Sequence, residues 1–178
     1  MKNPKILIDQ VLQHAQSKGE RRLDNGTRLV EPAPDIAPQA WRHLIFAPIP
    51  DADLAEIEGM LHQRFPDQLR MFYKTSNGIS MFGGGIDVWG KRYNWARSGD
   101  AVWQPFDIVS HNHPADRPKH SPYEVVYFGS SDRGENRVYF RSGSGIIGKT
   151  GRKIFDEKET WIDFDTWLGA EILMRFPS

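Results

Sequence analysis

The hydrophobic pattern of the chain changes its period at Gly78, and this change constrains the fold more than any other feature. Before Gly78, apolar residues recur at every third or fourth position, which is typical of amphipathic helices. After it, short segments alternate between apolar and polar residues, which is typical of strands. The strand-like segments follow one another without helices between them, and one helical segment closes the chain. This order predicts an α+β fold with an antiparallel meander rather than alternating βαβ units.

The first 45 residues are predicted to form an extra helix and an arm. An apolar stripe at helical spacing predicts a helix over Lys5–Gln16, which Gly19 ends. Residues 17–38 are polar and contain three prolines, which predicts an arm or connector. A short strand is possible within it, at Arg28–Val30. Residues 41–48 are compatible with an extended segment.

The segment Phe65–Ile79 carries the clearest helix signals. Pro66 suits the first turn of a helix, where its missing N–H costs nothing. Asn77 and Gly78 are predicted to stop this helix, because glycine tolerates the left-handed conformation. The helix would pack through an apolar stripe formed by Leu69, Phe72 and Tyr73.

The other elements are predicted from the same two periods. They are a helix from Asp51 or Asp53 to about Arg64, strands at Ile86–Val88 and Ala101–Trp103, a hairpin of Glu124–Ser131 and Asn136–Ser142, two short strands within Gly145–Phe155, and a closing helix capped by Asp163 or Asp165.

Composition and charge narrow the classes of function. The 23 basic and 23 acidic side chains give a formal net charge of zero, which disfavours a general nucleic-acid-binding protein. The absence of cysteine excludes disulfides and thiolate chemistry. The N-terminal segment does not read as a signal peptide, and no apolar run approaches the ~20 residues of a membrane helix. A soluble, cytoplasmic protein is therefore expected.

The order of elements resembles that of the SUKH superfamily, which contains fungal cell-wall assembly regulators and many bacterial toxin-immunity proteins. The matching segments are PDADLAEIEGMLHQRFP at residues 50–66, DQLRMFYKTSNG at 67–78, VVYFGSSDRGENRVYF at 125–140 and TWIDFDTWL at 160–168. The likeness covers residues 46 to the C-terminus. It implies a SUKH-like domain over 46–178, with residues 1–45 packed on or beside it.

The resemblance also implies a function in binding rather than catalysis. Pro66, Asn77 and Gly78 would be scaffold residues, and neither an activity nor a cofactor is carried over. The implied function is that of an immunity protein, bacterial and cytoplasmic, which occludes the active site of a cognate toxin. The alternative of the same fold is an intracellular scaffold or regulatory adaptor.

Two motifs support a third, enzymatic alternative, and each has a weak context. Residues 143–150, GSGIIGKT, match the phosphate-binding loop, but Gly151 follows at once instead of a helix, so a turn between two strands explains the motif better. His111 and His113 would share a face of an extended segment and could bind a metal with His120 or Asp116. Three prolines in that region indicate an exposed loop with solvated histidines instead.

Residues 89–106 interleave aromatic and basic side chains, the types enriched at the hot spots of protein interfaces. For Trp89 and Trp103 the favoured alternative is core packing, whereas for Tyr93, Trp95 and Arg97 the two interpretations are evenly balanced. Binding of single-stranded nucleic acid would use similar residues, but the neutral chain disfavours it. The predicted partner-binding residues are Trp89, Arg92, Tyr93, Trp95, Arg97 and Trp103.

Overall fold

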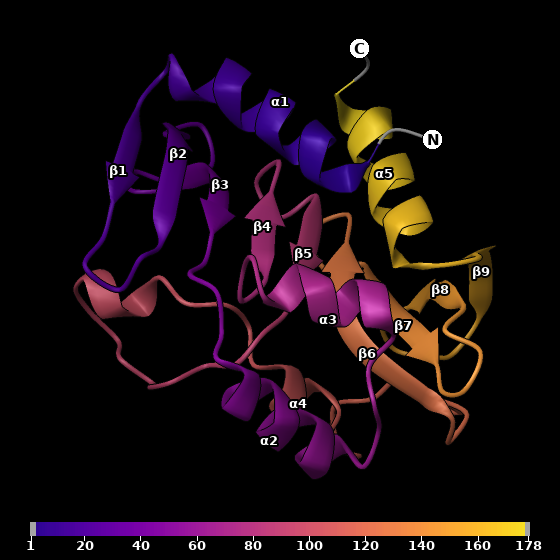
Figure 1. Cartoon of the computed structure of the whole chain (residues 1–178). Helices are drawn as coiled ribbons and strands as arrows, with labels where there is room; N and C mark the ends of the chain where they lie inside the picture. The colour runs from indigo at the N-terminus through magenta and orange to yellow at the C-terminus, as the bar shows by residue number, and fades with distance from the viewer. Residues whose placement is uncertain (1–2, 177–178) are drawn as a thin grey trace.

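The computed structural model describes residues 3–176, which form a nine-stranded antiparallel sheet with helices packed on it (Figure 1). Neighbours in the sheet are neighbours in the chain, from β1 to β9, so the sheet is a meander and the predicted α+β fold is confirmed. The elements are α1 (Pro4–Gln16), β1 (Glu20–Arg22), β2 (Arg28–Pro32), β3 (Trp41–Ile45), α2 (Asp51–Leu61), α3 (Asp67–Tyr73), β4 (Ile79–Met81), β5 (Ile86–Val88), the 3₁₀-helix η1 (Asp100–Val102), α4 (Ile108–His111), β6 (Val125–Ser131), β7 (Asn136–Arg141), β8 (Ile147–Gly151), β9 (Glu157–Trp161) and α5 (Phe164–Arg175).

The N-terminal region contributes more to the sheet than its sequence predicted. The helix is confirmed, with Asn3 Oδ1 accepting a hydrogen bond of 2.8 Å from the N–H of Lys5. Residues 17–38 were predicted to be a connector with a short strand at Arg28–Val30; that strand is confirmed within β2, and β1, which was not predicted, pairs with it. β3 then pairs with β4, so the first three strands continue the central sheet. A domain boundary between residues 45 and 46 remains a prediction.

The hydrophobic core lies between one face of the sheet and the helices α3 and α5. The ring of Phe128 in β6 lies 5.8 Å from that of Phe164 and 5.2 Å from that of Trp167, both in α5. Tyr73, at the end of α3, is fully buried, and its hydroxyl donates a hydrogen bond of 2.6 Å to the carbonyl of Trp89. Burying each such aromatic side chain contributes about 2 kcal/mol to stability.

Three turn regions of the sheet differ from the prediction or refine it. Ala101–Trp103 is not a strand but lies in and after η1, because the chain leaves the sheet after β5. The segment Gly145–Phe155 contains one strand, β8, rather than two, since its partner β9 begins only at Glu157. Gly83–Gly85 lie in the turn between β4 and β5.

The closing helix α5 is capped and ion-paired. Asp163 Oδ1 accepts a hydrogen bond of 2.7 Å from the N–H of Thr166, which confirms one of the two predicted caps. Glu171 is fully buried, and its carboxylate lies 2.6 Å from Arg175 and 3.4 Å from Lys149 in β8. The described helices include none with the length and apolar character needed to cross a membrane.

Candidate functional site

The candidate site is built on residues 91–106, which we call the aromatic loop. The loop leaves the sheet after β5 and returns at α4, with only η1 as regular structure inside it (Figure 1). Its two ends are joined by backbone hydrogen bonds, from Gly90 N–H to the carbonyl of Phe106 (3.0 Å) and from Ile108 N–H to the carbonyl of Gly90 (2.9 Å). The loop is thus closed at its base and projects from a fixed point of the sheet.

Asn77 holds the first residue of the loop. Its side-chain amide donates to the carbonyl of Lys91 and accepts from the N–H of the same residue, both at 2.7 Å. Gly78 has a φ of +92°, and a Cβ there would lie 2.3 Å from the carbonyl oxygen of Val88. The predicted role of Asn77 and Gly78 as a helix stop is therefore wrong, since α3 ends at Tyr73 and this pair instead packs against the chain that enters the loop.

A second set of contacts ties the loop to α2. The ammonium group of Lys91 lies 2.9 Å from Asp53 Oδ1 and 2.7 Å from Glu56 Oε2. The hydroxyl of Tyr93 donates to Asp53 Oδ2 at 2.5 Å. Asp53 was predicted as a possible helix cap, but the N-cap position of α2 is Pro50, and Asp53 binds the loop instead.

These contacts shift the pKa values of all three groups toward the paired state. The hydrogen bonds from Tyr93 and Lys91 lower the pKa of Asp53. The hydrogen bonds to Glu56 and Asp53 raise the pKa of Lys91 to about 12. Burial, followed by the hydrogen bond to Asp53, raises the pKa of Tyr93 to about 12. Lys91 and Asp53 therefore stay charged, and their ion pair persists, throughout the neutral pH range.

The outer surface of the loop exposes part of the predicted set. Trp95 is 69% exposed, and the guanidinium of Arg92 lies 5.1 Å from its ring centroid, in cation–π geometry. Tyr93 is 56% exposed, and Arg97 is also exposed. The structure therefore brings Arg92, Tyr93 and Trp95 together at the surface, while their role in binding a partner stays a prediction.

The other two predicted aromatic residues lie deeper. Trp89 is 1% exposed and stacks against His111, with ring centroids 4.3 Å apart. Trp103 is half-buried, and its carbonyl accepts a hydrogen bond of 3.2 Å from the hydroxyl of Thr27. Both positions agree with the alternative of packing rather than direct contact with a partner.

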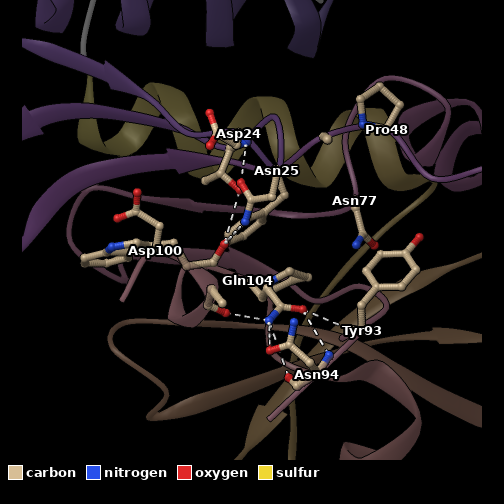
Figure 2. Close-up of a pocket in the computed structure, with 14 residues that line it drawn as sticks. Asp24, Asn25, Pro48, Asn77, Tyr93, Asn94, Asp100 and Gln104 are labelled. Carbon is tan, nitrogen blue, oxygen red and sulfur yellow. Dashed lines mark hydrogen bonds between the residues drawn. The ribbon is translucent and has the colours of Figure 1, made fainter. Parts of the chain in front are cut away.

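A cavity of about 440 Å³ opens between the aromatic loop and the turn that joins β1 to β2 (Figure 2). Gln104 organises its loop side: its carbonyl oxygen accepts from the N–H of Tyr93 at 2.9 Å, and its amide nitrogen donates to the carbonyl of Ala101 at 2.6 Å. Asp100, another lining residue of the loop, is held by Arg21 of β1 through two contacts of 2.8 and 2.9 Å. The lining is Asp24, Asn25, Thr27, Phe46, Ala47, Pro48, Asn77, Tyr93, Asn94, Asp100, Ala101, Trp103, Gln104 and Pro105.

The glycine-rich motif at residues 143–150 lies in a turn and a strand. Gly143 and Gly145 lie in the turn between β7 and β8, and the residues that follow form β8. Lys149 lies 2.6 Å from Glu159 and 3.4 Å from Glu171. The predicted turn between strands is confirmed, and the lysine of the motif is engaged in ion pairs within the fold.

The histidines do not share a face of an extended segment. His111 is the last residue of α4 and contacts Asp116 through Nδ1 at 2.5 Å, while His113 lies in the turn after it and accepts from the N–H of Ala115 at 3.2 Å. Within residues 3–176, no group of three histidine or acidic side chains is placed to hold a metal ion.

Sequence reasoning identified the exposed residues of the loop but missed the residues that anchor it. Asp53, Lys91 and Gln104 were not singled out for this role, because their partners lie 11 to 40 positions away along the chain. The only local signal was the aromatic and basic composition of the loop itself.

Comparison with models of protein families gives a match over residues 48–170, well over half of the chain, to the family described as SMI1 / KNR4 (SUKH-1). The match begins just after β3 and ends within α5. It therefore contains the aromatic loop together with Asn77 and α2, which hold the loop in place. A comparison with curated proteins gave no match.

Proposed function

The chain belongs to the SMI1 / KNR4 family (SUKH-1), and on this basis we propose that it is a non-enzymatic binding protein, an immunity protein that neutralises a bacterial toxin. The observation that carries the proposal is the exposed Trp95, stacked on a half-buried Arg92, on a loop that is closed at its base and tied to α2. Tryptophan and arginine dominate interface hot spots when they are presented in a fixed arrangement.

Pre-organisation favours this loop as the contact surface. A flexible loop loses conformational entropy when it binds, which weakens the complex. Here the hydrogen bonds from Asn77 and the ion pairs of Lys91 fix the start of the loop, and Gln104 links its two halves. The hydroxyl of Tyr93 is also held by Asp53, and the ring of Trp95 lies against Arg92, so a partner would have less of the loop to order.

The proposed mode of action is occlusion of the toxin. The net charge is zero, so the protein does not mimic a nucleic-acid substrate by its overall charge. The loop presents aromatic surface with Arg92 and Arg97, while Asp24 and Asp100 line the neighbouring cavity. Recognition would depend on this local pattern, and inhibition on covering the toxin's active site. The proposed compartment is the bacterial cytoplasm, where a producing cell needs protection.

The experiment is a pull-down of the tagged protein from its native host, with mass spectrometry of the co-purified proteins. A single stoichiometric partner with a toxin-like C-terminal domain supports the immunity function. Trp95→Ala is expected to weaken that complex by about 2 kcal/mol, roughly 30-fold in Kd. Tyr123→Ala is the matched control, because Tyr123 is 89% exposed but lies outside the loop.

Three other outcomes would contradict the proposal or its interface. Several unrelated housekeeping partners would favour the second candidate, an intracellular scaffold or adaptor of the same family. Saturable nucleotide binding that Lys149→Ala abolishes would favour an enzyme, although the ion pairs of Lys149 with Glu159 and Glu171 argue against it. A complex that survives Trp95→Ala unchanged would place the interface elsewhere.

A further inference from the structure

A second cavity, which we call the basic groove, lies at the C-terminal end of α2. Its volume is about 730 Å³, and it is bounded by residues 60–63 at the end of α2 and by the segment 112–123 that follows α4. α2 and α4 lie side by side (Figure 1), and the start of β6 lines the groove with Val125 and Val126. The groove is therefore formed by elements that pack on one another.

The charged side chains that line this groove are all positive. They are Arg117 and Lys119, and neither forms an ion pair within residues 3–176. The acidic residues within two positions of a lining residue contact basic side chains outside the groove. They are Glu58, which pairs with Arg70, Asp116, which contacts His111 and Arg137, and Glu124, which pairs with Arg141. The groove therefore carries uncompensated positive charge in a chain whose formal net charge is zero.

Both positive residues are held by the fold. Two N–H groups of the Arg117 guanidinium donate to the carbonyls of Val125 at 3.0 Å and Pro122 at 2.8 Å, which leaves its charge without a counter-ion. The backbone of Lys119 makes two hydrogen bonds of 2.8 Å with the segment 152–156, one as donor and one as acceptor. A binding surface that is fixed in advance loses less conformational entropy when a ligand binds.

The contact of Lys119 with the segment 152–156 extends the positive charge beyond the groove. This segment exposes Arg152 and Lys153 and has one acidic residue, Asp156. Neither Arg152 nor Lys153 forms an ion pair within the described part of the chain. The basic surface therefore continues from the groove onto the connection between β8 and β9.

Two histidines of the groove lining have a left-handed backbone. His62 has a φ of +52° and His120 a φ of +66°, and both are exposed. Residues with a Cβ are uncommon in this region, and such strained positions cluster at binding sites. An imidazole N–H at these positions is a hydrogen-bond donor that suits a carboxylate.

From these observations we propose that the basic groove binds an acidic segment of a partner protein, in which carboxylate side chains alternate with apolar ones. Clusters of basic side chains recognise carboxylates, and Leu61, Val125 and Val126 provide apolar surface beside them. Single-stranded nucleic acid needs aromatic rings for successive bases. The lining has one aromatic residue, Tyr123, which at 89% exposure makes few contacts with the floor of the groove. The proposal does not depend on the immunity function or on the aromatic loop.

The test is an NMR titration of the full chain with a blocked Asp-Leu-Glu-Leu-Asp peptide at low ionic strength. Saturable chemical-shift changes are expected in residues 60–63 and 112–126, with an affinity that falls as NaCl is added. A blocked Asn-Leu-Gln-Leu-Asn peptide, which has a similar shape without charge, is expected to give no saturable change. Equal binding of this neutral peptide would overturn the proposal, and so would tighter binding of an oligothymidylate or of citrate at the same residues.

Variants test the charge and the strained backbone separately. Lys119→Glu is expected to weaken peptide binding at least about tenfold. Lys5→Glu makes the same change of charge on α1, at the opposite end of the molecule (Figure 1), and is the matched control with an affinity within about twofold of the wild type. Unchanged affinity in Lys119→Glu, or an equal loss in Lys5→Glu, would overturn the proposal.

His120→Gly is expected to weaken binding about threefold, because it removes one donor. Its urea midpoint should equal or exceed that of the wild type, since glycine adopts this backbone with less strain. Unchanged binding in His120→Gly would remove the histidine from the site. Lys119 is exposed, and its side chain makes no hydrogen bond within the described residues, so Lys119→Glu should fold. The positions of the shift changes in the wild-type chain decide the location of the site independently of both variants.

Discussion

Replacing Asn77 with alanine tests whether this side chain anchors the aromatic loop. The side chain is 4% exposed, and it makes two hydrogen bonds of 2.7 Å to the backbone of Lys91, one as donor and one as acceptor. Alanine removes both bonds without changing the backbone of residue 77. The N–H and the carbonyl of Lys91 then lose their partners in the fold.

The magnitude follows from the number of bonds and from the exposure of Lys91. A hydrogen bond in a protein contributes about 1 kcal/mol net, and a buried group left without a partner costs about 1–3 kcal/mol. Lys91 is only half-buried, so water can reach part of the exposed backbone. The expected loss in the free energy of unfolding is therefore about 2 kcal/mol, the sum of the two bonds.

Urea unfolding followed by tryptophan fluorescence measures this loss, because Trp89 and Trp167 are buried and report on the core. Gln13→Ala is the matched control: Gln13 is exposed on α1, and truncating its amide is expected to change stability by less than about 0.5 kcal/mol. A loss below about 0.5 kcal/mol in Asn77→Ala would refute the anchoring argument. So would unchanged amide exchange in residues 91–106.

Three further predictions concern the scaffold. Burial lowers the pKa of His43 from 6.5 to about 4, so between these pH values the unfolded state binds a proton that the folded state does not. The contribution of His43 to the free energy of unfolding is therefore full above pH 6.5 and falls by up to about 3 kcal/mol toward pH 4. Urea unfolding at pH 4.5 and pH 7 should show a smaller difference in stability for His43→Gln than for the wild type. Glu171→Gln removes a fully buried carboxylate from Lys149 and Arg175, which keep Glu159 and Asp132 as partners, and should cost about 2 kcal/mol by urea unfolding. Gly90→Ala should lower stability by about 3 kcal/mol, because its Cβ would lie 2.2 Å from the carbonyl of Asn77, whereas Gly59→Ala on α2, with open space around it, should not destabilise in the same assay.

Elements with strong local patterns could be predicted from the sequence. The helix over Lys5–Gln16 and the hairpin of β6 and β7 follow from periodicity and turn residues within a few positions of each other. The short strand predicted at Arg28–Val30 lies within β2, whereas β1 could not be predicted, because its three residues are all polar and are stabilised by pairing with β2. The prediction of a strand at Ala101–Trp103 was wrong for a related reason. Three apolar residues do not show whether a neighbouring strand is available for pairing.

The residues of the candidate site also fall into those that the sequence predicted and those that it did not. Composition alone pointed to Trp95 and Arg92, which the structure places together on the surface. The anchors were missed because each has a plausible local role: Asp53 near a helix start is typical of a cap, and Asn77 before glycine is typical of a helix stop. Both side chains instead bind residues of the loop, and such non-local contacts leave no trace in a short sequence window.

Different residues hold the aromatic loop in place and cover its outer surface. The contacts that hold the loop use Asn77, Asp53, Lys91 and the backbone, whereas Trp95 and Arg97 donate and accept no side-chain hydrogen bonds within the described residues. Substitution at the exposed positions therefore changes what the loop presents without removing what holds it. This separation requires the urea midpoint of the double variant Trp95→Ala, Arg97→Ala to match that of the wild type. A large decrease would mean that these side chains also stabilise the fold.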